Sequence, residues 1–164
     1  MTSGRSVLVE DVLIHVDRAL RGMCATLTDL GDELANVRPA LPGANSAYAI
    51  LTHCLGVMEF WGGQVLAGRE IVRDRAAELV ASGPVAELVA RVPAGRDRLL
   101  ADLVAYDGAA PPTGPLEDRD RDDLPEFTRT QGGVLMHIYE ELAQHRGHVD
   151  LTADLVRHAS GVRL

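Results

Sequence analysis

The chain has 164 residues, of which 46% are hydrophobic and 24% are charged, and a net charge of −8. These values exclude a disordered or fibrous chain and favour a single globular domain over residues 1–164. The negative charge, with no strong basic cluster, argues against nucleic acid as a partner, because binding to phosphates needs a positive surface.

Neither the N-terminal residues nor any internal stretch has the features of a membrane or export segment. The start, MTSGRSVLVED, lacks the apolar region of a signal peptide, and the longest apolar stretch carries His53 and Glu59. The two cysteines, Cys24 and Cys54, are too few for a disulfide framework and read as thiols in a reducing compartment. We therefore expect a cytoplasmic protein with no membrane partner.

The first half of the chain predicts two long helices. Apolar residues at spacings of three and four predict a helix over residues 6–34, and the prolines and glycine of RPALPGANS end it. Asn45 or Ser46 is a suitable N-cap for a second helix over residues 46–66. A short helix is expected over residues 69–80.

Prolines set the limits of the third long helix. Pro84 suits its first turn, and Pro93 is expected to kink or interrupt it before it ends near Asp107. Residues 108–127 form a polar connection rich in proline and charge. A connection of this length is uncommon without a role, so we expect it, with the loop before Asn45, to shape a pocket.

The last helix is predicted to begin near Thr128 or Thr130 and to reach about His158. No alternation of period two is long enough to indicate a strand. The predicted fold class is therefore all-α, a four-helix bundle with a long crossover connection before the last helix.

The segment HIYEELAQHRGHVD on the last helix raises the question of function. At 100° per residue, His137, Glu141, Gln144, His145 and His148 fall within one stripe about 100° wide. Such a stripe can simply face water. Three histidines within twelve residues favour another interpretation, because histidine is scarce and is the commonest nitrogen ligand of metals.

Glu141 and His145 lie one turn apart and can bind one ion together, but a zinc site needs a third ligand from another helix. His53, inside the apolar segment AILTHCLGVMEFW, is a candidate, although a lone histidine there can also be a core residue. Cys54 is a competing soft ligand that points 100° away from His53. His15 on the first helix could reach the open end of the bundle.

The remaining polar and aromatic residues near these segments have ordinary explanations. Met58, Glu59 and Trp61 are expected to pack or cap, and Asp150 is expected to be solvated or to form an ion pair. His158, close to the C-terminus, is expected to be exposed.

Two blocks, NSAYAILTHCLGVMEFWGGQVLAG and HIYEELAQHRGHVDL, resemble the DinB superfamily, in particular its branch of mycothiol- and bacillithiol-dependent metalloenzymes. The resemblance implies a DinB-like four-helix bundle that binds one divalent metal through His53, Glu141 and His145. Glutamate at position 141 is similar to the thiol-dependent, maleylpyruvate-isomerase-like members. His137 and His148 exceed this triad, and we expect them to lie behind the ligands or on the substrate side, as candidate catalytic residues.

The resemblance further implies a function: a divalent-metal-dependent thiol S-transferase. A low-molecular-weight thiol such as mycothiol would be the cosubstrate and would attack a small-molecule electrophile as a metal-bound thiolate. Zinc suits mixed nitrogen and oxygen ligands, but nickel, iron(II) and manganese stay open. The alternatives are a thiol-dependent isomerase, a metal-dependent hydrolase with His137 or His148 as proton acceptor, and a non-enzymatic metal-binding stress protein, with a homodimer also open.

Overall fold

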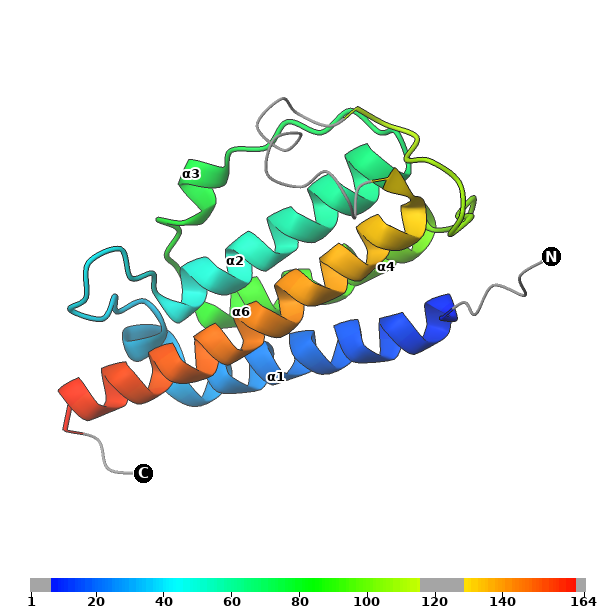
Figure 1. Ribbon diagram of the computed structural model, residues 1–164. Coiled ribbons are helices and arrows are strands. Elements are labelled where there is room, and N and C mark those ends of the chain that lie inside the picture. The colour runs from blue at the N-terminus through cyan, green and yellow to red at the C-terminus, as the bar shows by residue number, and fades with distance from the viewer. Residues whose placement is uncertain (1–6, 116–128, 162–164) are drawn as a thin grey trace.

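The computed structural model describes residues 7–115 and 129–161. The elements are α1 (Val9–Ala35), α2 (Ala47–Met58), the π-helix η1 (Glu59–Leu66), α3 (Arg75–Glu78), α4 (Val85–Asp102) and α6 (Gln131–Ala159). No strand occurs in these two ranges, and α1, α2 with η1, α4 and α6 pack side by side (Figure 1). The predicted all-α bundle is confirmed.

The C-terminal end of α1 fixes the start of α4 beside it. Gly31 has a φ of 68°, in the left-handed region that glycine tolerates, and the last turn of the helix follows it. Asp32 then accepts a hydrogen bond of 2.7 Å from the backbone N–H of Val85, and Asn36 exchanges two hydrogen bonds with the backbone of Gly83. These contacts bind two helix ends that are about fifty residues apart in the chain.

The second helix begins as the sequence predicted but widens before it ends. The side chain of Ser46 caps α2 by accepting a hydrogen bond of 3.2 Å from the N–H of Ala49. From Glu59 onwards the turns are of the π type, as shown by the hydrogen bond from the N–H of Ala67 to the carbonyl of Gly62. The apolar spacing could not reveal this change, because most residues of η1 are buried on every side.

The prediction of a short helix over residues 69–80 is mostly wrong, since only Arg75–Glu78 is helical. Residues 69–74, which precede it, are not helical. Two arginines of this segment form ion pairs: Arg69 binds Asp102 at 2.8 Å, and Arg73 binds Glu78 at 2.7 Å. We call residues 69–78 the strap. It runs back along α2, so that α2 and α4 point in the same direction (Figure 1).

Helix α4 differs from its prediction at two points. Pro93 is exposed and lies inside it without interrupting it, although it leaves one carbonyl of the helix without its backbone donor. The helix ends at Asp102, not near Asp107, and turns through Leu103 follow it.

The start of α6 lies beside the turn that follows α4. Thr130 caps α6 by accepting a hydrogen bond of 3.1 Å from the N–H of Gly133. This confirms Thr130, one of the two predicted starts of the helix. The N–H of Gln131 donates to the carbonyl of Ala110, and its side-chain oxygen accepts from the N–H of Asp107. The long connection therefore joins two helix ends at the same end of the bundle. Residues 116–128, most of the expected polar crossover, lie outside the described residues.

Aliphatic side chains form most of the core, and α6 supplies a central row of them: Val134, Leu135, Ile138, Leu142, Val149 and Val156. Both cysteines are free, Cys54 buried and Cys24 half-buried. Within residues 7–115 and 129–161, no helix combines the length and the apolar character that crossing a bilayer requires.

Candidate metal centre

Helices α2 and α6 bring His53, Glu141 and His145 together. One possible donor atom from each lies within 4.8 Å of the other two. The Nε2 atom of His145 is 3.4 Å from Oε2 of Glu141, and Nε2 of His53 is 4.0 Å from the same oxygen. The two imidazole rings meet edge to face, with centroids 5.0 Å apart. The three side chains thus face one point between the two helices.

The chemistry and spacing of these donors fit a divalent cation. Two ligands of a tetrahedral zinc ion, each about 2.1 Å from it, are about 3.4 Å apart. The two donor pairs at 3.4 and 4.0 Å are close to this value, and movements of about 1 Å in the side chains would close the widest pair. Two imidazoles and one carboxylate are also a donor set that leaves one position of a tetrahedral zinc ion open.

A carboxylate from the strap lies on the other side of His53. Oε2 of Glu78 is 2.8 Å from Nδ1 of the imidazole, while the opposite nitrogen, Nε2, faces Glu141. Arg73 binds both oxygens of Glu78, at 2.7 and 2.8 Å. Glu78 and Arg73 could not be predicted from the sequence, because nothing in their spacing connects a charged loop with a histidine on a separate helix.

The charges of the site suit a cation. Burial alone would raise the pKa of Glu78, but hydrogen bonds from Arg73 and His53 outweigh it and hold this pKa below its usual range. The hydrogen bond with His145 lowers the pKa of Glu141 against the opposing effect of burial. Both groups are therefore carboxylates at neutral pH, and together with Arg73 they leave one net negative charge beside two imidazoles.

The two additional histidines of the stripe have different surroundings. His137 is buried, and its ring meets the single tryptophan, Trp61, edge to face at 4.7 Å between centroids. His148 is exposed and stacks on His145 at 5.9 Å. Partial burial and the neighbouring His145 lower the pKa of His148. Their roles in catalysis stay predictions.

The structure places the other candidates away from the cluster. His15 is exposed on α1 and its ring lies 5.6 Å from that of Tyr139 on another face of α6. Cys54 points into the core between α1 and α2. His158 is exposed, as expected.

The expectations for Asp150, Met58 and Trp61 are confirmed, whereas Glu59 forms ion pairs instead of packing or capping. Asp150 forms an ion pair of 2.8 Å with Arg146. Met58 and Trp61 are buried in the core. Glu59 accepts hydrogen bonds from Arg69 and Arg98, which ties η1 to the strap and to α4.

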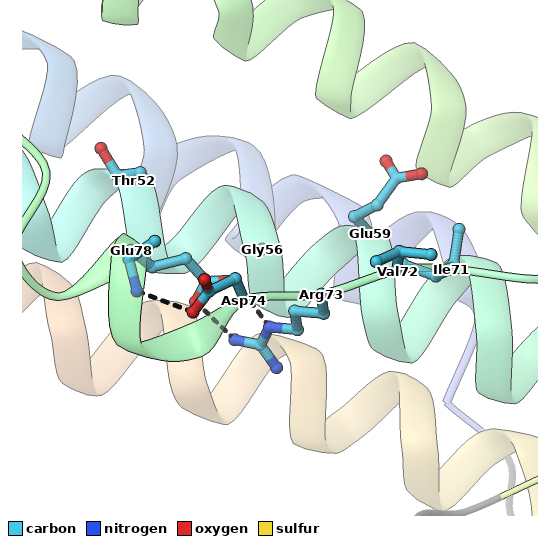
Figure 2. A pocket seen from close by; sticks show the side chains of 9 residues that line it. Thr52, Gly56, Glu59, Ile71, Val72, Arg73, Asp74 and Glu78 are labelled. Atoms are coloured by element: carbon cyan, nitrogen blue, oxygen red, sulfur yellow. Dashed lines mark hydrogen bonds and ion pairs between the residues drawn. The ribbon is translucent and has the colours of Figure 1, made fainter.

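A hollow of about 300 Å³ lies beside Glu78, between the strap and α2 (Figure 2). Thr52, Gly56 and Glu59 line its helical side, and residues 71–74 of the strap line the other. Figure 2 shows the guanidinium of Arg73 reaching the carboxylate of Glu78 at this hollow. The strap thus closes over His53 but leaves a recess next to the carboxylate that contacts it.

The fold and the site together define a class of protein: a helical bundle with a His–Glu–His cluster, suited to a divalent cation, between two of its helices. Residues 11–159 match the mycothiol S-transferase family, and the chain belongs to this family. This match confirms the branch of the DinB superfamily that the two sequence blocks indicated. No curated protein and no solved structure matches the chain.

Proposed function

We propose that the protein is a divalent-metal-dependent S-transferase that joins mycothiol to a small electrophilic molecule. The observation that carries the proposal is the meeting of His53, Glu141 and His145 in a chain of the mycothiol S-transferase family. We propose these three residues as the metal ligands and zinc as the ion, because two nitrogens and one oxygen suit it.

A divalent cation in this position would lower the pKa of a thiol at its open coordination position, so that the thiolate is abundant at neutral pH. The chain's own part is to hold the donors in place. His53 is buried and bound on its far nitrogen by Glu78, while Glu141 and His145 lie one turn apart on α6. Little reorganisation is then needed when the cation binds.

In the transfer, the sulfur of the thiol forms a bond to the electrophilic carbon, and the leaving group departs with the electron pair of the bond that breaks. The thiol proton goes to solvent or to a nearby base. We propose His148 as this base, because its lowered pKa keeps it neutral at pH 7 and because it stacks on His145 at the exposed side of the cluster.

The chain needs no cysteine of its own for this reaction. Burial, together with the charges of Glu141 and Glu78, raises the pKa of Cys54 far above neutrality, so that this thiol stays protonated. A buried, protonated thiol is a poor nucleophile. The nucleophilic sulfur must come from the cosubstrate.

The direct test measures loss of free thiol from mycothiol in the presence of an alkylating probe. The zinc-loaded protein should accelerate this loss, while the metal-free protein and His145→Ala, an exchange within the triad, should not. His158→Ala, an exposed histidine outside the cluster, should retain full activity. No rate above background with mycothiol or with other low-molecular-weight thiols would contradict the proposal.

His148 also favours a second candidate, metal-assisted hydrolysis, since a neutral imidazole beside the cluster could accept a proton from water instead of from a thiol. Turnover of an ester or amide substrate without added thiol would support this function. Stable metal binding without turnover of any electrophile would support the non-enzymatic alternative.

A further inference from the structure

The end of the strap contacts α2 at a candidate ligand. Glu78, the last residue of α3, is 25 positions from His53, yet its Oε2 lies 2.8 Å from the imidazole Nδ1. The side chain of His53 is 4% exposed and that of Glu78 is 11% exposed. A contact this short and this well shielded from solvent constrains the ring strongly.

The contact determines which nitrogen of His53 carries the proton. Arg73 binds both oxygens of Glu78, so Glu78 is a carboxylate and can only accept hydrogen bonds. Nη2 of Arg73 also lies 3.3 Å from Nδ1, but an unprotonated Nδ1 would place a lone pair 2.8 Å from the carboxylate. The shorter contact therefore requires Nδ1–H, which leaves the lone pair of Nε2 directed towards Glu141.

Arg73 is fixed on several sides, which in turn fixes Glu78. Its side chain is 8% exposed, and its guanidinium carbon lies 5.5 Å from the centroid of the Phe60 ring. A guanidinium that binds a carboxylate through two nitrogens and stacks on an aromatic ring has little freedom to move. The carboxylate is thus held in place beside the imidazole.

Gly56 makes room for this carboxylate. It lies three residues after His53 on the same face of α2, and a Cβ atom added there would be 2.0 Å from Oε1 and 2.5 Å from the carboxyl carbon of Glu78. Any other residue at this position would push Glu78 away from His53. A Cβ atom added at Gly147 on α6 would have no other atom within 4 Å, so Gly147 offers a matched control.

We propose that Glu78 is a positioning residue of the metal centre: it holds His53 as the Nδ1–H tautomer with Nε2 free for the cation, and Arg73 and Gly56 hold Glu78. The inference rests on the proposed role of His53 as a ligand. The metal affinity of the protein then depends on the strap, which contributes no ligand itself. Loss of such an outer partner typically lowers metal affinity by about 10- to 100-fold.

The test combines two readouts on Glu78→Ala, Glu78→Gln, Gly56→Ala and the control Gly147→Ala. Zinc affinity is measured by competition with a chromophoric chelator, and the tautomer of His53 by ¹⁵N NMR of the metal-free protein. We expect Nδ1–H in the unsubstituted protein and in Gly147→Ala. We expect a mixture of tautomers and about 10- to 100-fold weaker zinc binding in Glu78→Ala and Gly56→Ala.

Glu78→Gln keeps the shape of the side chain, so it guards against a variant that fails to fold. We expect it to bind zinc more weakly as well, because an amide is a weaker acceptor and leaves the charge of Arg73 uncompensated beside His53. Unchanged affinity in these folded variants, or a loss of affinity with an unchanged tautomer, would overturn the inference. Failure of the proposed function is distinguishable, because the zinc-loaded protein would then show no thiol transfer while the zinc affinity and the tautomer of His53 would still respond to Glu78.

Discussion

The Sγ atom of Cys54 lies 3.8 Å from Sδ of Met23, in the core between α1 and α2. His53, one residue earlier, faces α6 and the strap. Successive residues of a helix point about 100° apart, and here this difference separates a core thiol from a candidate metal ligand. The competing soft ligand that the sequence left open is therefore directed away from the cluster.

We expect the burial of Cys54 to make stability fall at alkaline pH. Burial raises the pKa of this thiol above its unfolded value of about 8.5, so above that pH the unfolded chain releases a proton that the folded chain retains. The stabilisation is complete below the unfolded pKa and is lost as the pH rises from there. Urea unfolding between pH 8 and 10 should show a decline that is smaller by up to about 1.4 kcal/mol per pH unit in Cys54→Ala, in which only the pKa of Cys24 is still raised by burial.

Alkylation gives an independent check of the same environment. Iodoacetamide should modify the half-buried Cys24 in the folded protein and Cys54 only after unfolding. Rapid modification of Cys54 in the folded protein, or equal pH dependence in the two proteins, would contradict the position of this thiol.

Local signals explain why the helix starts were predictable from the sequence. Ser46 and Thr130 each cap a backbone N–H three residues later, so the information lies within four residues. The pairing of Glu141 with His145 is equally local, because i and i+4 share a helix face. Adding His53 required a contact between two distant helices, and the family resemblance, not the spacing, selected it.

The features that the sequence did not reveal depend on contacts between distant segments. Residues 69–78 are expected from the sequence to belong to a short helix, whereas in the structure Arg69 and Arg73 form ion pairs with carboxylates. Which charges turn inward depends on where Asp102 and Glu78 lie in three dimensions. The π-helix η1 was missed because an apolar segment that is buried on all sides shows no period to compare.

The inward ion pair of Arg69 should stabilise the protein measurably. It binds both oxygens of Asp102, at 2.8 and 2.9 Å, and the side chain of Asp102 is only 5% exposed. We expect Arg69→Ala to lower the free energy of unfolding by about 1–3 kcal/mol in urea titrations, because a buried carboxylate loses its partner. Arg69→Lys should restore only part of this, since an ammonium cannot bind both oxygens in the same geometry.

The matched control for Arg69 is Arg98, which binds Glu59 at 3.0 Å with a side chain that is 58% exposed. Arg98→Ala should change the free energy of unfolding by less than about 1 kcal/mol, as is typical of exposed pairs. Equal losses for the two variants would show that burial of Asp102 does not determine the effect.

Replacement of Pro93 should stabilise the protein. This exposed proline lies inside α4 and cannot donate a hydrogen bond to the carbonyl of Val89, four residues earlier. We expect Pro93→Ala to raise the free energy of unfolding by about 1–2 kcal/mol, less than the full helix propensity difference because proline also restricts the unfolded chain. Pro42→Ala, in the loop before α2, should bring no gain, and a destabilised Pro93→Ala would contradict the reading of α4 as a regular helix.

The central claim is that His53, Glu141 and His145 share one cation. The most direct measurement is the metal content per chain of protein purified without a histidine tag, compared with His53→Ala, His145→Ala and the outside control His158→Ala. We expect about one divalent ion per chain in the unsubstituted protein and in His158→Ala, and strong loss in the other two, because two ligands do not make a stable zinc site. Equal metal content in all four folded proteins, or none in any of them after incubation with zinc, would contradict the account.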